Sequence, residues 1–152
     1  GEGTTVALYL PCSQDHAAEK QGDLAADVPM GRAKDVILVV EDEDRVRAFT
    51  VASLRDLGYT VLEAASGPLA LDILGQRPDI ALLFTDVVMP QMTGPQLVEQ
   101  ARTVRSDLRV VFTSGYTGSS SEADERIKAG GKFLAKPFSF DQLARKIGAA
   151  LA

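Results

Sequence analysis

The sequence has few of the features that mark secreted, membrane-spanning or nucleic-acid-binding proteins. Its single cysteine, Cys12, cannot form an internal disulfide, which fits a reducing compartment. No apolar run approaches the roughly 20 residues that a membrane-spanning helix needs, and the first residues lack the basic lead-in of a signal peptide. The net charge is −5, so the basic excess typical of nucleic-acid-binding domains is missing. We therefore expect a cytoplasmic chain that contacts neither a membrane nor nucleic acid.

From residue 35 onward, short apolar runs alternate with segments of helical periodicity. The run V-I-L-V-V over 36–40 is continuous, which is typical of a strand buried on both faces. We predict strands over 36–40, 60–64, 80–85, 109–113 and 132–135, and helices over 45–57, 69–74, 95–104, 122–129 and 140–151. Gly58 is expected to end the first helix, and Ser66 and Ser139 to begin the second and the last.

This alternation predicts an α/β fold in which helices cover both faces of a parallel sheet. Five strands are too few for a barrel of eight strand–helix units. They fit a flavodoxin-like, doubly wound five-stranded sheet of order 2-1-3-4-5. With 152 residues, of which 45% are hydrophobic, the chain is long enough for one domain with a real core, which we place at 35–152.

The first 34 residues differ from the rest. Residues 1–11 contain the β-rich run T-T-V-A-L-Y-L-P, and residues 12–34 are polar, with no sustained apolar period, as in a linker. One isolated strand is not stable by itself. Residues 1–11 are therefore either a disordered tail or the severed last strand of a preceding domain.

An acidic cluster is predicted at the carboxyl ends of the strands. The run L-L-F-T-D delivers Asp86 to a strand end, where ligands collect in open α/β sheets. In the order 2-1-3-4-5, strands 1 and 3 are neighbours, so Glu41 and Asp42 join Asp86. Three carboxylates repel one another unless a cation lies among them, and oxygen ligands suit Mg²⁺. The alternative is that the acidic run 41–44 only favours a helix amino terminus, which we prefer for its last two members.

Two further strand ends carry polar side chains. Thr113 ends the fourth predicted strand with a hydroxyl, and Lys136 follows the fifth, directly before Pro137. An ammonium and a hydroxyl both suit the oxygens of a phosphoryl group. Each residue alone is common at such a place, but together they surround one crevice with Asp86. We also expect a cis peptide bond between Lys136 and Pro137 that holds the lysine toward the site.

The motifs V-V-E-D, T-D-V-V-M-P-x-M-x-G, F-T-S-G-Y and F-L-A-K-P-F span the whole predicted domain. With them, residues 36–151 resemble a response-regulator receiver domain, the phosphoacceptor module of two-component signalling. The resemblance implies that Asp86 is phosphorylated and that Lys136 assists the transfer. It also implies that Mg²⁺ is bound by Glu41, Asp42, Asp86 and the backbone carbonyl of Val88. The switch residues that it implies are Thr113 and Phe133.

The resemblance also implies Mg²⁺-dependent phosphoryl transfer from a phosphohistidine, with a histidine kinase core or a histidine phosphotransfer protein as partner. Phosphorylation would switch the surface of helix 4, strand 5 and helix 5. Residues 1–11 resemble the closing segment of a histidine-kinase ATP-binding domain, where a Gly-x-Gly-Thr turn leads into a strand ending Leu-Pro. This favours the carboxyl-terminal receiver of a hybrid sensor histidine kinase, a phosphoacceptor rather than an independent enzyme.

Two alternatives stay open. One is a stand-alone receiver that acts by binding a partner protein. The other is a Mg²⁺-dependent phosphohydrolase with an aspartyl nucleophile. Such hydrolases resemble the pattern Asp-x-Asp at the strand end. Here Val88 stands at the position of the second aspartate, so the general acid is missing. We therefore favour the receiver.

Overall fold

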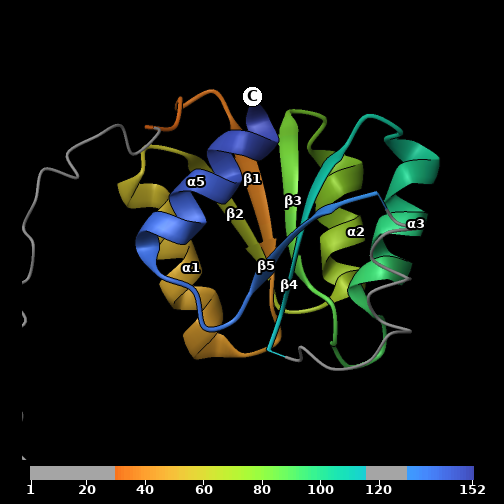
Figure 1. Ribbon diagram of the computed structural model, residues 1–152. Helices are drawn as coiled ribbons and strands as arrows, with labels where there is room; N and C mark the ends of the chain where they lie inside the picture. The colour runs from red at the N-terminus through yellow and green to blue at the C-terminus, as the bar shows by residue number, and fades with distance from the viewer. Residues whose placement is uncertain (1–29, 116–129) are drawn as a thin grey trace, which may run out of the picture.

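The computed structural model describes residues 30–115 and 130–152, and in this part of the chain five parallel strands form one sheet. The order is β2-β1-β3-β4-β5, as predicted (Figure 1). The strands are β1 (Val36–Val40), β2 (Thr60–Ala64), β3 (Ile80–Asp86), β4 (Arg109–Ser114) and β5 (Lys132–Ala135). The described helices are α1 (Asp44–Asp56), α2 (Gly67–Gln76), α3 (Gly94–Val104) and α5 (Phe140–Leu151). The predictions for 1–11, for 12–29 and for a helix over 122–129 lie outside the described residues.

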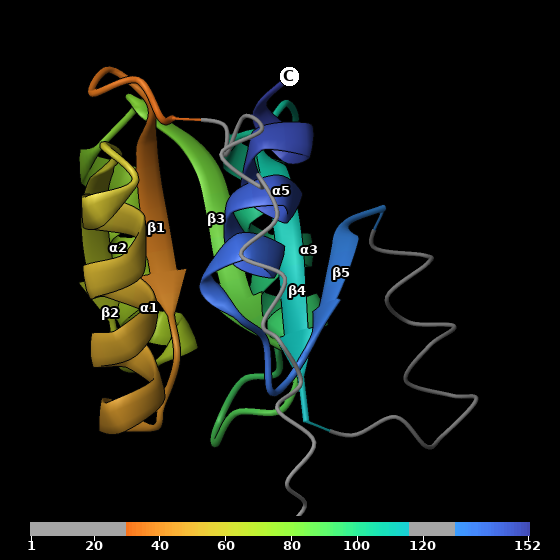
Figure 2. The same ribbon diagram turned by 60° about the vertical axis from the view of Figure 1, so that its left-hand side comes forward.

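The sheet is covered on both faces, which confirms the predicted layers. Helices α1 and α5 pack on one face and α2 and α3 on the other (Figure 2). Every residue of β1 is buried, because alternate side chains of a strand point to opposite faces and both faces are covered. Ile37 and Val39 belong to the core beside α1 and α5, and Leu38 belongs to the core beside α2 and α3. Burial of each large aliphatic side chain contributes about 1.5–3 kcal/mol to stability.

Helix ends follow the capping residues that the sequence predicts. Gly58 has a φ of 91° and directly follows the α1 C-cap, where its amide donates to the Arg55 carbonyl while that of Tyr59 donates to Leu54. These bonds satisfy carbonyls that the helix itself leaves unpaired, and glycine adopts the left-handed backbone at low cost. Ser139 caps α5 and completes a capping box with Gln142. Helix α1 starts and ends one residue earlier than predicted.

The segment before β1 contacts the turn between α1 and β2. The Gly31 amide donates to the Leu57 carbonyl at 2.7 Å, and the Thr60 hydroxyl donates to the Ala33 carbonyl at 2.7 Å. Gly31 also lies against the ring of Tyr59, so close that a Cβ atom there would be 2.5 Å from the ring. The chain therefore enters the domain at the amino ends of the strands. None of the described helices combines the length and the hydropathy that crossing a bilayer requires.

Candidate functional site

Side chains from four strand ends meet at the carboxyl edge of the sheet. Asp86 is the last residue of β3 and pairs in register with Thr113 of β4. Val40 lies opposite Thr85, so the next residue, Glu41, comes beside Asp86. Beyond β5, the Lys136 amide donates to the Ser114 carbonyl at 2.9 Å and extends the β4–β5 pairing toward the same edge. The structure thus brings together the residues that the sequence predicts to converge.

Lys136 makes ion pairs with two carboxylates of the site. Its ammonium Nζ lies 2.6 Å from Oδ2 of Asp86 and 2.7 Å from Oε2 of Glu41. The Lys136 side chain is 18% exposed and the two carboxylate side chains 12% and 4%. Burial by itself lowers the pKa of Lys136, but the hydrogen bonds to Asp86 and Glu41 outweigh it, so the pKa is raised. The lysine therefore stays charged in contact with both carboxylates.

For Glu41, burial outweighs the hydrogen bond from Lys136 in setting the pKa. Burial raises the pKa of its carboxyl group above the ordinary value of 4.5, although the hydrogen bond from Lys136 acts to lower it. The charge on Asp86 adds to the rise. A buried carboxylate beside a second one is costly unless cations compensate both, and one ammonium does so only in part.

The predicted acidic cluster is present in the structure. Glu41, Asp42 and Asp86 each offer one carboxylate oxygen, and these three oxygens lie within 4.8 Å of one another. Glu41 is 3% and Asp86 9% exposed, whereas Asp42 is on the surface, so the cluster opens to solvent on one side. An oxygen-only donor set that leaves room for water fits a hard divalent cation such as Mg²⁺.

The loop after β3 holds the Asp86 carboxylate from the other side. The Val88 amide donates to Oδ1 of Asp86 at 3.2 Å, and the Val88 side chain is 53% exposed. Gly94, at the start of α3, donates its amide to the Val87 carbonyl at 2.9 Å. A Cβ atom on Gly94 would lie 2.2 Å from the main-chain oxygen of Asp86. Only glycine therefore allows α3 to begin so close to the end of β3.

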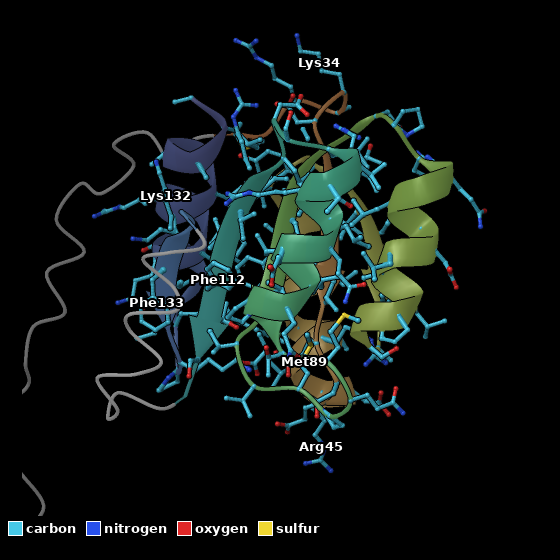
Figure 3. All side chains as sticks on the ribbon, turned by 90° about the vertical axis from the view of Figure 1, so that its right-hand side faces the viewer. Lys34, Arg45, Met89, Phe112, Lys132 and Phe133 are labelled. Carbon is cyan, nitrogen blue, oxygen red and sulfur yellow. The ribbon has the colours of Figure 1, made fainter. Side chains whose placement is uncertain are left out.

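Thr113 and Phe133 lie on the strands next to β3. Thr113 is completely buried, and its hydroxyl has no hydrogen-bond partner among the described residues. Phe133 is half-buried and packs against the core between the sheet and helices α2 and α3. It pairs in register with Phe112 of β4, and Figure 3 shows the two residues on neighbouring strands.

The geometry can be compared with known proteins. A family model described as the response regulator receiver domain matches residues 37–148. The chain belongs to the response-regulator receiver family. The sensor kinase CckA of Brucella abortus is 37% identical over 97% of this chain, which spans 16% of that kinase. The response regulator receiver protein CpdR of the same organism is 34% identical over 73% of this chain and 92% of its own length.

Solved structures agree with this assignment. The receiver domain of the hybrid histidine kinase CckA is 40% identical, with a TM-score of 0.66 over 80% of this chain and all of that domain. The chemotaxis protein CheY4 of Vibrio cholerae superposes with a TM-score of 0.71 at 28% identity over 77% of this chain and 98% of its own. The chain is a receiver domain of a two-component system. Receiver domains generally bind Mg²⁺ at an acidic cluster, and a two-component receiver exchanges phosphate with a histidine kinase or phosphotransfer protein.

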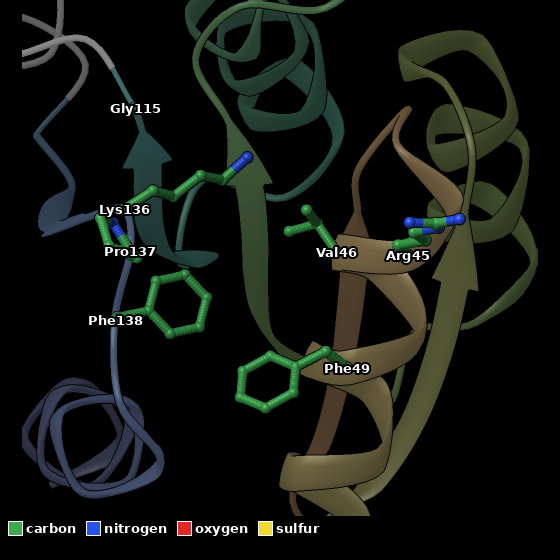
Figure 4. A pocket seen from close by; sticks show the side chains of 7 residues that line it. All are labelled: Arg45, Val46, Phe49, Gly115, Lys136, Pro137 and Phe138. Carbon is green, nitrogen blue, oxygen red and sulfur yellow. The ribbon is translucent and has the colours of Figure 1, made fainter. Parts of the chain in front are cut away.

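An apolar cavity adjoins the charged residues of this receiver. It has a volume of about 460 Å³ and lies between α1 and the segment that joins β5 to α5 (Figure 4). Its lining residues are Arg45, Val46, Phe49, Gly115, Lys136, Pro137 and Phe138. The peptide bond between Lys136 and Pro137 is cis, which confirms that prediction. Figure 4 shows the lysine side chain passing along the wall of the cavity, with its ammonium over the end of β3.

Some residues around the site were missed by sequence reasoning. Arg47 contacts the segment that carries Glu41, and Gly94 lies against the main chain of Asp86. Arg47 follows Asp44 by three residues, which is a helical ion-pair spacing, and Gly94 is the last residue of the motif T-D-V-V-M-P-x-M-x-G, but neither pattern predicts the contact itself. Phe49 and Phe138 line the cavity with ring centroids 6.3 Å apart, a contact that depends on the fold.

Proposed function

We propose that Asp86 is the phosphoacceptor of this receiver and that Glu41, Asp42, Asp86 and the Val88 carbonyl hold Mg²⁺ beside it. The observation that carries the proposal is the ammonium of Lys136, which contacts Asp86 and Glu41, the two buried carboxylates of the acidic cluster. Phosphoryl transfer depends mainly on the alignment of the reacting groups and on neutralisation of their charge. The carboxylate of Asp86 and the ammonium of Lys136, which meet at the ends of two strands, can supply both.

In the proposed reaction, a carboxylate oxygen of Asp86 forms a bond to phosphorus. The P–N bond of the phosphohistidine breaks, and its electron pair returns to the imidazole nitrogen. Lys136 keeps its proton throughout, because its raised pKa maintains the ammonium, and it neutralises oxygens of the transferring group. The Val88 amide orients the carboxylate through Oδ1. When bound, Mg²⁺ supplies further positive charge to the same oxygens.

The proposed switch uses Thr113 and Phe133. The buried Thr113 hydroxyl has no partner among the described residues, so a phosphoryl oxygen on Asp86, its register partner, would give it an acceptor. Movement of Thr113 toward the phosphoryl group would free space for the half-buried ring of Phe133 to turn inward. The surface of β5 and α5 would change with it. Such a change is a two-state response to a local charge.

For the parent protein, we favour a hybrid sensor histidine kinase. The alignment with the sensor kinase CckA includes 97% of this chain, so it extends into residues 1–34, before the receiver fold. The alignment with the receiver protein CpdR covers 73% of this chain, and CpdR represents the alternative of a stand-alone receiver. Phosphoryl transfer from candidate kinase cores, compared with transfer from phosphotransfer proteins, tests which partner this receiver accepts.

The phosphoacceptor role is tested by incubation with acetyl phosphate and Mg²⁺. We expect one phosphoryl group per chain, loss of uptake in Asp86→Asn, and unchanged uptake in Asp72→Asn, which removes an exposed carboxylate from α2. Multiple turnover without a stable phosphoprotein would instead support the phosphohydrolase. Full uptake by a folded Asp86→Asn protein would refute the assignment.

A further inference from the structure

Arg47 joins three segments beside the acidic cluster. It lies in the first turns of α1, and its side chain is only 16% exposed. Its Nη1 donates to the main-chain carbonyl of Glu41 at 2.9 Å. Its Nη2 lies 2.6 Å from Oδ1 of Asp44 in α1, and its Nε lies 3.3 Å from Oε2 of Glu63 in β2. One guanidinium therefore links the end of β1 to both elements that flank it.

The bond to the Glu41 carbonyl fixes the peptide that connects Glu41 to Asp42. The Glu41 amide still pairs with the Ala64 carbonyl at 3.2 Å, the last contact of this residue with β2. Because a peptide unit is planar, holding its carbonyl also fixes the plane that contains the amide nitrogen and the Cα atom of Asp42. Asp42 is exposed, and in residues 30–115 and 130–152 no hydrogen bond holds its carboxylate. Its position thus depends on the main chain.

The two ion pairs of Arg47 contribute little to the stability of the fold. The Asp44 side chain is 85% and the Glu63 side chain 46% exposed, and ion pairs with exposed carboxylates contribute little. Their geometry instead holds the planar fork of the guanidinium in the orientation that places Nη1 on the Glu41 carbonyl. Lysine has a flexible point charge and cannot reproduce this three-way contact.

We propose that Arg47 is a positioning residue that holds Glu41 and Asp42 in the arrangement needed to bind a divalent cation. The proposal rests on the metal site of the proposed function. A positioning role and a purely electrostatic role predict opposite changes in cation affinity when Arg47 is replaced. Arg47 offsets the negative charge of Asp44 and Glu63, so loss of its charge alone would make the site more negative and bind the cation more tightly. Loss of positioning weakens binding even when the charge is kept.

Arg47→Lys separates these effects, because it keeps the charge and loses the fork. We expect its dissociation constant for Mn²⁺, measured by electron paramagnetic resonance, and for Mg²⁺, measured by competition, to rise about tenfold, the lower end for residues that support metal ligands. The Mg²⁺ concentration for half-maximal phosphorylation by acetyl phosphate should rise equally, with the rate at saturating Mg²⁺ unchanged. Arg77→Lys is the matched control, since Arg77 pairs with Asp79 at 2.8 Å beyond the opposite ends of the strands.

A second variant tests the same link from β2. Glu63→Asp keeps the charge but withdraws the carboxylate from Nε, so we expect weaker cation binding in the same direction. Unchanged or tighter binding in both Arg47→Lys and Glu63→Asp would overturn the positioning role while leaving the metal site intact. A wild-type chain that binds neither cation would instead refute the metal site itself, so the two failures are distinguishable.

Discussion

Replacement of Gly94 by alanine tests how closely α3 must approach the end of β3. A Cβ atom at this position would lie 2.2 Å from the Asp86 carbonyl oxygen, 3.1 Å from its carbon and 3.2 Å from the Val87 Cα. All three atoms are main chain, so no side-chain rotation relieves the contact. The start of α3 or the end of β3 must move, and the loop that contains Val87 and Val88 would move with either.

The expected cost has two parts. Overpacking of a well-packed site typically costs about 1–3 kcal/mol, and a rigid backbone contact belongs at the upper end. The hydrogen bond from the Gly94 amide to the Val87 carbonyl would also be distorted, which removes about 0.5–1.5 kcal/mol. We therefore expect Gly94→Ala to lower the free energy of unfolding by about 3 kcal/mol.

Urea unfolding in metal-free buffer, followed by circular dichroism, measures this loss. Gly75→Ala in α2 is the matched control, because Gly75 is helical and a Cβ atom there would meet nothing within 4 Å. That variant should gain about 0.5–1 kcal/mol from the higher helix propensity of alanine. A loss below about 1 kcal/mol in Gly94→Ala would refute the close approach, as would an equal loss in both variants.

Three further predictions concern the charged residues and the switch. Lys136→Met should lose about 1.5–3 kcal/mol of stability without metal, because two largely buried carboxylates lose a charged hydrogen-bond donor, and Mg²⁺ should restore part of it; equal losses with and without Mg²⁺ would contradict this reading. The raised pKa of Glu41 means that the folded state binds its proton more readily than the unfolded state, so this group contributes stability at low pH that is lost as pH rises through the folded pKa. The free energy of unfolding of wild type minus that of Glu41→Gln should therefore increase on acidification from neutral pH toward 4.5, and a flat difference would count against the burial. Thr113→Val should leave the free energy of unfolding within about 1 kcal/mol, because it removes a buried hydroxyl without a described partner, but should reduce the amide chemical-shift changes in β5 that follow phosphorylation; unaltered shift changes would argue against the switch role.

The centre of the sheet could be predicted from the sequence because β1, β3 and β4 are almost completely buried. A parallel strand covered on both faces has to be apolar along its whole length, as V-I-L-V-V over 36–40 is, and such runs leave little ambiguity. Helix ends were predicted to within about one residue where glycine or a capping serine marks them, as at Gly58 and Ser139. Convergence of Asp86 and Lys136 then followed from the strand order alone.

The supporting residues could not be predicted in the same way. The contact of Arg47 with the Glu41 carbonyl depends on the angle between α1 and β1, and the contact of Gly94 with Asp86 depends on how sharply the chain turns after β3. Neither angle is encoded in a local pattern. The cavity beside Lys136 likewise depends on Phe49 and Phe138, which are far apart in the sequence but meet along its wall with ring centroids 6.3 Å apart.

The most direct test of the central proposal is to locate the phosphoryl group chemically. The receiver is phosphorylated with acetyl phosphate and Mg²⁺, the acyl phosphate is trapped by borohydride reduction, and the modified residue is identified by peptide mass spectrometry. We expect the reduced residue at Asp86, with Glu41 and Asp42 unmodified. Reduction at another carboxylate, or at none despite phosphoryl uptake, would contradict the assignment of Asp86 as the phosphoacceptor.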